Sequence, residues 1–283
     1  MIRSVLIVVM LALMAGCSGV RLGYNSADKV LAYRMDDWFD LPEALRQPAR
    51  DRLHRVLAWH RREELPRYAD ILRSAERRLA DPAPLGASEL LVLQRQVTGR
   101  LLVLGDQVAA EFAEILAQLG PPQRRRLLAR LDRSNEEFRE DYLEADAAAV
   151  RQRRIDQLAD RYQFWLGRLS PAQRARLEQW VDARGVDAAW RMSLRQDRQR
   201  VFVGIVDEAV QSRSPPRTAA RLRAFFADLE QPSAAAVRTR HDEGERARAQ
   251  LTADLFNMAT PAQRDKARER LRRLADDCLA LAG

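Results

Sequence analysis

A six-residue phrase that marks the start of a helix recurs along this chain. Leu169-Ser170-Pro171-Ala172-Gln173-Arg174 returns as Ala259-Thr260-Pro261-Ala262-Gln263-Arg264, with a looser copy at 119–124 and a degenerate one at 40–45. The hydroxyl residue caps the amides of the first turn, and proline suits the first helical position. The glutamine reaches back to the amide of the capping residue. The phrase therefore restricts the chain to folds in which several helices begin anew after short breaks.

Apolar side chains recur at helical spacing along the chain, and no stretch shows sustained strand alternation. The sequence predicts an all-α, elongated bundle of about eight to ten helices. The longest opens at Ser88 and runs for about 30 residues, or about 45 Å. A hinge between sub-domains is a possibility at 213–216. Breaks or kinks are expected where a proline lacks the amide proton, near Pro66, Pro121, Pro171, Pro215 and Pro261.

The N-terminus reads as a bacterial lipoprotein signal. A positive start with Arg3 precedes an apolar run, and Cys17 directly follows Gly16. We predict cleavage after Gly16, a lipid on Cys17 and a mature domain over 17–283, with residues 1–16 removed. The apolar run falls short of the roughly 20 residues that span a bilayer. An ordinary signal peptide with a coincidental cysteine is the alternative. Ser18 in place of aspartate indicates the outer membrane, with the body in the periplasm.

The positive charge is uneven. The formal net charge is +8, and residues 150–200 carry twelve arginines against six acids. In an exported lipoprotein we expect the membrane as a partner through the lipid, and no nucleic acid. Arg151, Arg153 and Arg154 are candidates for contact with anionic lipid or cell-wall polymer. Alternatively, these arginines lie on solvated helix faces and pair with acids three or four residues away.

The sequence favours a binding protein over an enzyme. His60 with Glu63 and Glu64 is the best polar constellation, and His54 stands at the wrong helical angle to complete a metal site with it. We expect a partly buried His60 paired with Glu64. The sequence has neither a Gly-rich phosphate loop nor a nucleophile elbow. We therefore predict no catalytic residues, no metal and no cofactor besides the lipid on Cys17.

Aromatic residues gather near the start of the mature chain. They belong either to the core or to an interaction surface for apolar segments of a partner. Cys278 is expected to be a small buried residue, because acylation of Cys17 leaves it without a disulfide partner. The candidate interaction residues of this region are Trp38, Trp59, His60, Glu64 and Tyr68.

Four blocks of the sequence, at 24–25, 36–41, 59–68 and 161–173, resemble an uncharacterised family of proteobacterial lipoproteins. That family carries a domain of unknown function over nearly the whole mature chain, so the resemblance implies an outer-membrane lipoprotein without assigned activity. The helix-start phrase is also similar to the LTxxQ motif of Spy-type periplasmic chaperones. The leading hypothesis is non-catalytic binding of envelope proteins or unfolded clients, the alternative is a structural tether, and an enzyme is the third.

Overall fold

The computed structural model describes residues 19–185 and 187–283. Gly16, Cys17 and the predicted signal segment lie outside this range. Within it all regular structure is helical, and the predicted all-α bundle with breaks at the five prolines is confirmed. The helices are α2 (Gly19–Asn25), α3 (Ala27–Phe39), α4 (Glu43–Trp59), the π-helical turn η2 (His60–Glu64), α5 (Leu65–Ala80), α6 (Ala87–Leu116), α7 (Pro121–Tyr142), α8 (Ala147–Leu166), α9 (Pro171–Arg184), α10 (Ala188–Ser212), α11 (Pro215–Glu230), α12 (Ala235–Asn257) and α13 (Pro261–Ala282).

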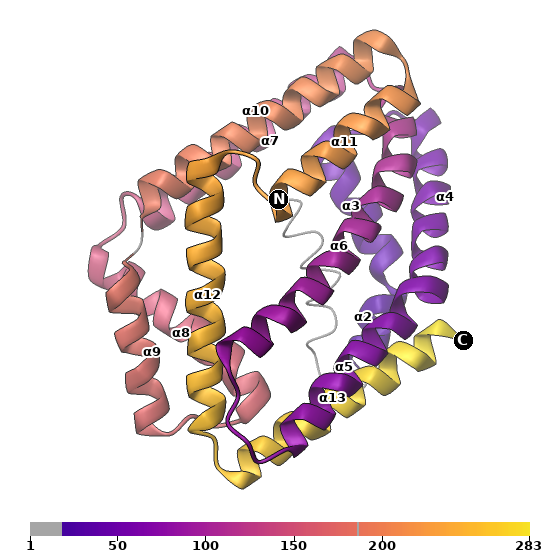
Figure 1. Ribbon diagram of the computed structural model, residues 1–283. Helices are drawn as coiled ribbons and strands as arrows, with labels where there is room; N and C mark the ends of the chain where they lie inside the picture. Colours follow the sequence, from indigo (N-terminus) through magenta and orange to yellow (C-terminus); the bar gives the residue numbers. More distant parts are fainter. Residues whose placement is uncertain (1–18, 186) are drawn as a thin grey trace.

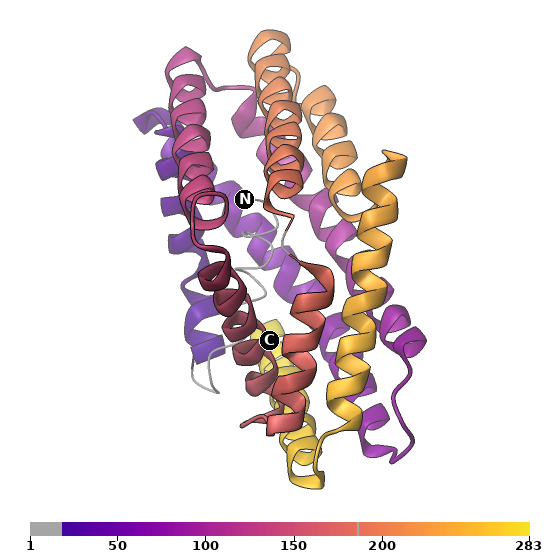
Figure 2. The same cartoon turned by 90° about the vertical axis from the view of Figure 1, so that its left-hand side faces the viewer.

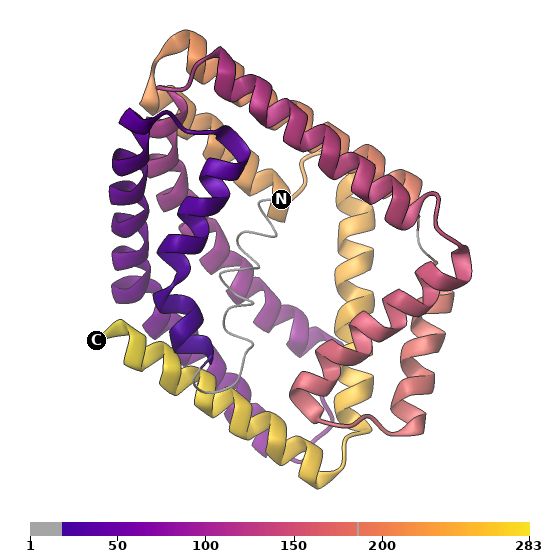
Figure 3. The same cartoon turned by 180° about the vertical axis from the view of Figure 1, so that it is seen from behind.

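The helices lie along the sides of an open quadrilateral frame (Figures 1 and 3). One side holds α7 and α10, the next α3 and α4, the third α5 and α13, and the last α8, α9 and α12. Helix α6 crosses diagonally from the side of α12 to the side of α4, and α11 packs against it. Seen from the side, many of the helices run lengthwise (Figure 2). The buried apolar residues of the described chain accordingly form three separate clusters. The largest joins α3, α4, α6, α7, α10 and α11, the second α8, α9, α12 and α13, and the third α2, α3, α4, α5 and α13.

The helix-start phrases cap their helices and also meet in space. Ser170 Oγ accepts from the Gln173 amide at 3.2 Å, and Thr260 Oγ1 accepts from the Gln263 amide at 3.2 Å. Both glutamines reach back to their caps as predicted. The Gln173 side chain also donates to Oε1 of Gln263 at 3.2 Å, and Gln263 donates to Gln173 at 3.1 Å. Two copies that lie 90 residues apart thus hold α9 and α13 together.

The looser copy joins a second corner of the frame. Gly120 has no side chain to cap with, yet its amide donates to Gln123 Oε1 at 3.2 Å. The Gln123 side chain donates to the Asp40 carbonyl at 3.1 Å, where α3 ends beside the degenerate fourth copy. At the α10–α11 break, Arg213 donates to the carbonyls of Ala117 and Leu119 and fixes that turn against the end of α6.

The predicted kink at Pro66 takes the form of a π-helical turn. Proline cannot donate an amide hydrogen bond to the preceding turn. The chain widens just before it, so that the Leu65 amide donates to the His60 carbonyl five residues back. The helix then continues as α5, with Pro66 in its first turn. The turn places His60 and Glu64 inside the molecule, both almost fully buried.

Helix α6 is the long helix that the sequence predicts. It contributes Ala109, Ala113, Ile115 and Leu116 to the largest cluster. Its first turn begins at Ala87, with Glu89 accepting from the Gly86 amide at 3.0 Å, so Ser88 lies one residue inside the helix. Gly105 allows a close crossing with α11, because a Cβ there would stand 3.2 Å from Phe226 Cβ. In the described range no helix has the length and apolar character of a membrane span.

Candidate functional site

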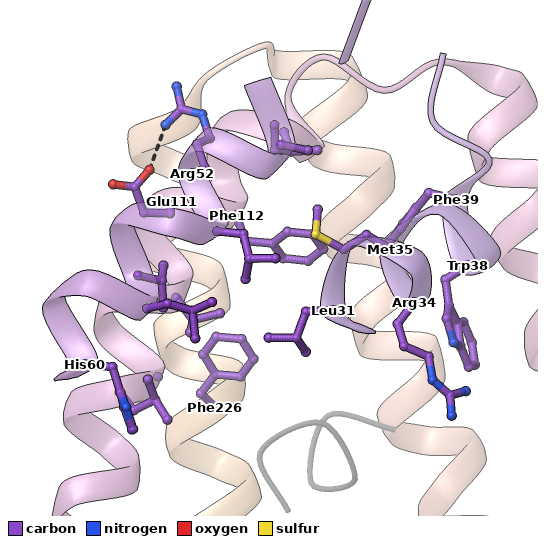
Figure 4. A pocket seen from close by; sticks show the side chains of 18 of the residues that line it. Leu31, Arg34, Met35, Trp38, Phe39, Arg52, His60, Glu111, Phe112 and Phe226 are labelled. Carbon is purple, nitrogen blue, oxygen red and sulfur yellow. Dashed lines mark hydrogen bonds and ion pairs between the residues drawn. The ribbon is translucent and has the colours of Figure 1, made fainter. Parts of the chain in front are cut away.

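An apolar pocket of about 200 Å³ lies between α3, α4 and α6, with one residue each from α10 and α11 (Figure 4). Almost all of its wall is carbon and sulfur. Leu31 and Met35 come from α3, and Phe112 comes from α6. Phe226 of α11 forms part of the wall opposite. The remaining apolar lining is Trp38, Phe39, Ala49, Leu53, Val56, Leu57, Leu104, Gly105, Val108, Ile115 and Phe202.

The pocket exists because three helices meet without filling the space between them. Met35, Leu53, Val56, Val108 and Phe112 all line the pocket and remain only half-buried. Protein interiors are normally packed as densely as organic crystals. Half-buried apolar side chains around a common space therefore mark a place where an apolar ligand gains contacts.

Charged side chains stand at the edge of the pocket. Arg52 donates to Glu111 at 3.1 Å, and Figure 4 shows this pair at one edge. Arg34 lies beside Trp38 on the far side of the same view, and no ion pair forms between Arg34 and a described residue. The pocket is thus apolar in its middle and charged at its rim, the pattern of a small-molecule site with a few orienting polar groups.

His60 lies at the end of the pocket away from Trp38. Its Nδ1 is 2.7 Å from the Tyr24 hydroxyl, and Tyr68 packs edge-on against the ring at 5.4 Å. Burial lowers the pKa of His60 to about 4 and raises the pKa of Tyr24 to about 12, so both are neutral at pH 7. The buried Nε2 atom makes no hydrogen bond to a described residue. Among the residues that line the pocket, His60 and Trp38 are the two whose uncharged rings contain nitrogen.

The predicted pairing of His60 with Glu64 is wrong. Glu64 is 1 % exposed and receives two hydrogen bonds from Arg100 of α6, at 2.8 and 2.7 Å. A bidentate guanidinium is a much stronger partner for a buried carboxylate than a neutral imidazole. The sequence does not reveal Arg100, because it lies 36 residues away on another helix.

The aromatic residues near the start of the mature chain divide between core and surface. Tyr24 and Phe39 are core residues, at 2 % and 3 % exposure, whereas Tyr33 is 69 % exposed. Trp38 is half-buried and lines the pocket; Trp59 is half-buried too but is outside the pocket lining. Tyr68 packs against His60 behind the pocket wall. Of the five candidate residues, Trp38 and His60 line the pocket, at its opposite ends. Tyr68 packs on His60, Glu64 is buried against Arg100, and neither they nor Trp59 line the pocket.

The predicted basic surface already has internal partners. Arg151 donates twice to Asp182, at 2.6 and 2.9 Å, and Arg153 bonds to Asp141 at 3.1 Å. Arg154 donates to the Gly185 carbonyl and lies over the Trp180 ring, 5.1 Å from its centroid. These partners are 12 to 31 residues away in sequence, not on the neighbouring turn.

Most of the pocket wall could not be predicted from the sequence. Leu31, Met35 and Trp38 show helical spacing, but the same spacing describes a core. The half-buried state that separates the two depends on how α3, α4 and α6 cross. Cys278 behaves as predicted: it is fully buried, and burial raises the pKa of its thiol to about 12. Across the described residues no three side chains of the His, Cys, Asp and Glu types gather where they could hold a metal ion.

Comparison with known proteins gives one match. Residues 37–231, which include most of the pocket wall, match the model of a family of unknown function, DUF6279. No curated protein and no solved structure shows a significant match to the chain.

Proposed function

We propose that this chain, which belongs to the DUF6279 family of unknown function, is a lipid-anchored, non-catalytic protein of the bacterial envelope that binds an acyl chain. The observation that carries the proposal is the apolar pocket between α3, α4 and α6. The lipid anchor and the outer-membrane location rest on the sequence around Cys17 and Ser18. A protein held at a lipid surface by its own acyl groups works close to other molecules that carry acyl chains.

The size of the pocket suits a short length of hydrocarbon. A water molecule takes up about 30 Å³ in the liquid, so the 200 Å³ of the pocket equals roughly seven waters. A chain of similar cross-section places about six methylenes there. At about 0.8 kcal/mol for each buried methylene, the gross gain is about 5 kcal/mol before the entropic cost of binding. A gain of this size corresponds to a dissociation constant of about 0.2 mM at best, so millimolar affinity is expected for six methylenes alone.

A pair of matched variants tests the proposal. Val108 and Val92 both lie on α6, but Val108 lines the pocket and Val92 is 47 % exposed elsewhere. We expect N-phenyl-1-naphthylamine, a neutral apolar fluorophore, to bind the mature protein and to be displaced by dodecanol. Val108→Phe fills the pocket and should weaken probe binding at least about tenfold, which is a loss of about 1.4 kcal/mol. Val92→Phe should leave it unchanged. Equal probe binding by the two variants would refute the proposal.

Other occupants give different results in the same assay. An apolar segment of an unfolded polypeptide, as in helical periplasmic chaperones, would slow aggregation of a denatured client and would be displaced poorly by dodecanol. A tether that acts through Arg151, Arg153 and Arg154 would bind anionic vesicles and lose that binding on charge reversal, with Val108→Phe having no effect. Because those three arginines already have partners inside the protein, we prefer acyl-chain binding to the tether hypothesis.

A further inference from the structure

A second and larger cavity, of about 690 Å³, adjoins the apolar pocket. Its walls come mainly from α10 and α12, with contributions from α3, α7, α8 and α11, on the side of the frame where α12 meets α10 (Figure 1). Part of the wall is apolar, from Leu131, Phe138, Trp190, Phe225 and Leu229. The polar part is dominated by guanidinium groups: Arg161, Arg191, Arg195, Arg198, Arg240 and Arg248.

The lining of this second cavity contains six arginines and one histidine but no carboxylate. Two of the arginines use acids just outside the lining, since Arg240 pairs with Asp187 at 2.9 Å and Arg248 with Glu245. Arg195 instead donates to Ser134 and Asn135, which are neutral. Neither Arg161 nor Arg191 forms an ion pair within the described parts of the chain. The cavity thus holds more positive charge than its surroundings neutralise.

Arg191 is held in place by aromatic rings and repels two neighbouring arginines. It lies over two rings of α7, 5.0 Å from the Tyr142 centroid and 5.4 Å from that of Phe138. Aromatic faces hold a guanidinium in place without neutralising it. Burial, with Arg191 as a further cause, lowers the pKa of both Arg154 and Arg195. Positioned, mutually repelling cations of this kind match an anion that several of them bind together.

The two cavities share part of their walls. Trp38 of α3 and Phe202 of α10 line both the apolar pocket and the arginine cavity. Figure 4 places Trp38 at the opposite end of the apolar pocket from His60, so the arginine cavity adjoins the end away from His60. A molecule with a hydrocarbon chain and an anionic head could therefore place its chain in the apolar pocket and its head in the arginine cavity, with Trp38 between them.

We infer that the two cavities form one site for an anionic amphiphile, with the acyl chain between α3, α4 and α6 and the phosphate or carboxylate head among the arginines of α10 and α12. This rests on the proposed acyl-chain binding and adds the charge of the ligand. A phosphate head can come from a phospholipid or from a phosphorylated glycolipid, and a carboxylate head from a free fatty acid. The bidentate geometry of guanidinium fits either group.

Calorimetry on the full mature protein tests the inference, with the two anionic ligands below their critical micelle concentrations and the alcohol below its solubility limit. Dodecyl phosphate, dodecanoate and dodecanol share one chain and differ only in the head. We expect both anions to bind at least about tenfold more tightly than dodecanol at low salt. The larger gain of the two identifies the head group. Added sodium chloride should reduce that advantage, because screening weakens the arginine contacts and leaves the chain contacts unchanged.

A double variant locates the effect. Arg161→Gln with Arg191→Gln should remove most of the preference for the anions and leave dodecanol binding as it was. Arg151→Gln with Arg153→Gln, which alters two self-paired surface arginines, should retain the preference. If the three ligands bind equally to the unaltered protein, the inference fails and acyl-chain binding stands. If dodecanol fails to displace the neutral fluorophore, the proposed function fails and the amphiphile site fails with it.

Discussion

The apolar pocket and the arginine cavity touch at Trp38 and Phe202, yet they treat charge in opposite ways. Near the first, the buried Glu64 is paired with Arg100, and Arg52 in the lining is paired with Glu111, while Arg34 at the rim forms no ion pair with a described residue. Around the second, Arg161 and Arg191 have no such partner within the described residues. The same pair of aromatic residues thus separates a mostly apolar region, with one arginine at its rim that pairs with no described residue, from a region where several arginines gather and an anion would complete the pairing.

The difference teaches where to look for function in an arginine-rich helical protein. The arginines that stand out in the sequence, Arg151, Arg153 and Arg154, already bind acids and carbonyls elsewhere in the fold. The arginines of the cavity are less conspicuous. They are spread over α8, α10 and α12, and only the crossing of these helices collects them.

Removing the partner of the most deeply buried charge should have the largest effect. Arg100→Ala leaves the Glu64 carboxylate, 1 % exposed, without its cation. We expect a loss of about 3–5 kcal/mol in the free energy of unfolding, measured by urea denaturation. The control is Arg151→Ala, which breaks a pair with both side chains about half exposed. That change should cost less than about 1 kcal/mol. Equal losses would contradict the view that the buried Glu64–Arg100 pair matters more to stability than an exposed pair.

The second largest effect is expected from acid, which should lower the free energy of unfolding through the buried His60. The pKa of His60 is about 4 in the folded protein and about 6.5 when exposed, so only the unfolded chain takes up a proton between these values. The contribution of His60 is therefore complete above pH 6.5 and is lost as the pH falls toward 4, by about 3 kcal/mol. His60→Phe should flatten the dependence of unfolding free energy on pH in this window. An unchanged slope in His60→Phe would contradict the assignment of this acid sensitivity to the buried imidazole.

Two glycines of α6 offer a test of how tightly the pocket is framed. Gly105→Ala places a methyl group 3.2 Å from Phe226, whereas a methyl at Gly99 meets nothing within 4 Å. Alanine in a helix gains up to about 1 kcal/mol over glycine, and overpacking costs about 1–3 kcal/mol. We expect the melting temperature to rise for Gly99→Ala and to fall for Gly105→Ala, with about 2 kcal/mol between the two variants. A rise in both would show that the α6–α11 crossing has room to spare.

Replacing the shared wall should give the smallest and most diagnostic effect. Trp38→Leu alters both cavities, so it should weaken binding of the neutral fluorophore and of dodecyl phosphate alike, by about three- to tenfold. Trp59→Leu removes a half-buried tryptophan outside the lining of either cavity and should change neither affinity. If Trp38→Leu affects one ligand only, the two cavities work independently.

The sequence by itself determined the secondary structure and most of the helix boundaries. Ser170 with Gln173, and Thr260 with Gln263, contain all the atoms of a capping box within four residues, so their hydrogen bonds follow from local geometry. The break at Pro66 is local in the same sense, because proline lacks the amide that the next turn needs. Cys278 was predictable as a buried residue from its apolar neighbours.

Only the tertiary structure decided which residues meet. The partner of Glu64, the separation of Trp38 from Trp59, and the convergence of arginines from α8, α10 and α12 all join positions that are far apart in the chain. Arg191, Arg195 and Arg198 share one face of a helix, and that spacing is visible in the sequence. What α10 faces is not, because a helical period fixes the direction of a side chain relative to its own axis and says nothing about the neighbouring helix.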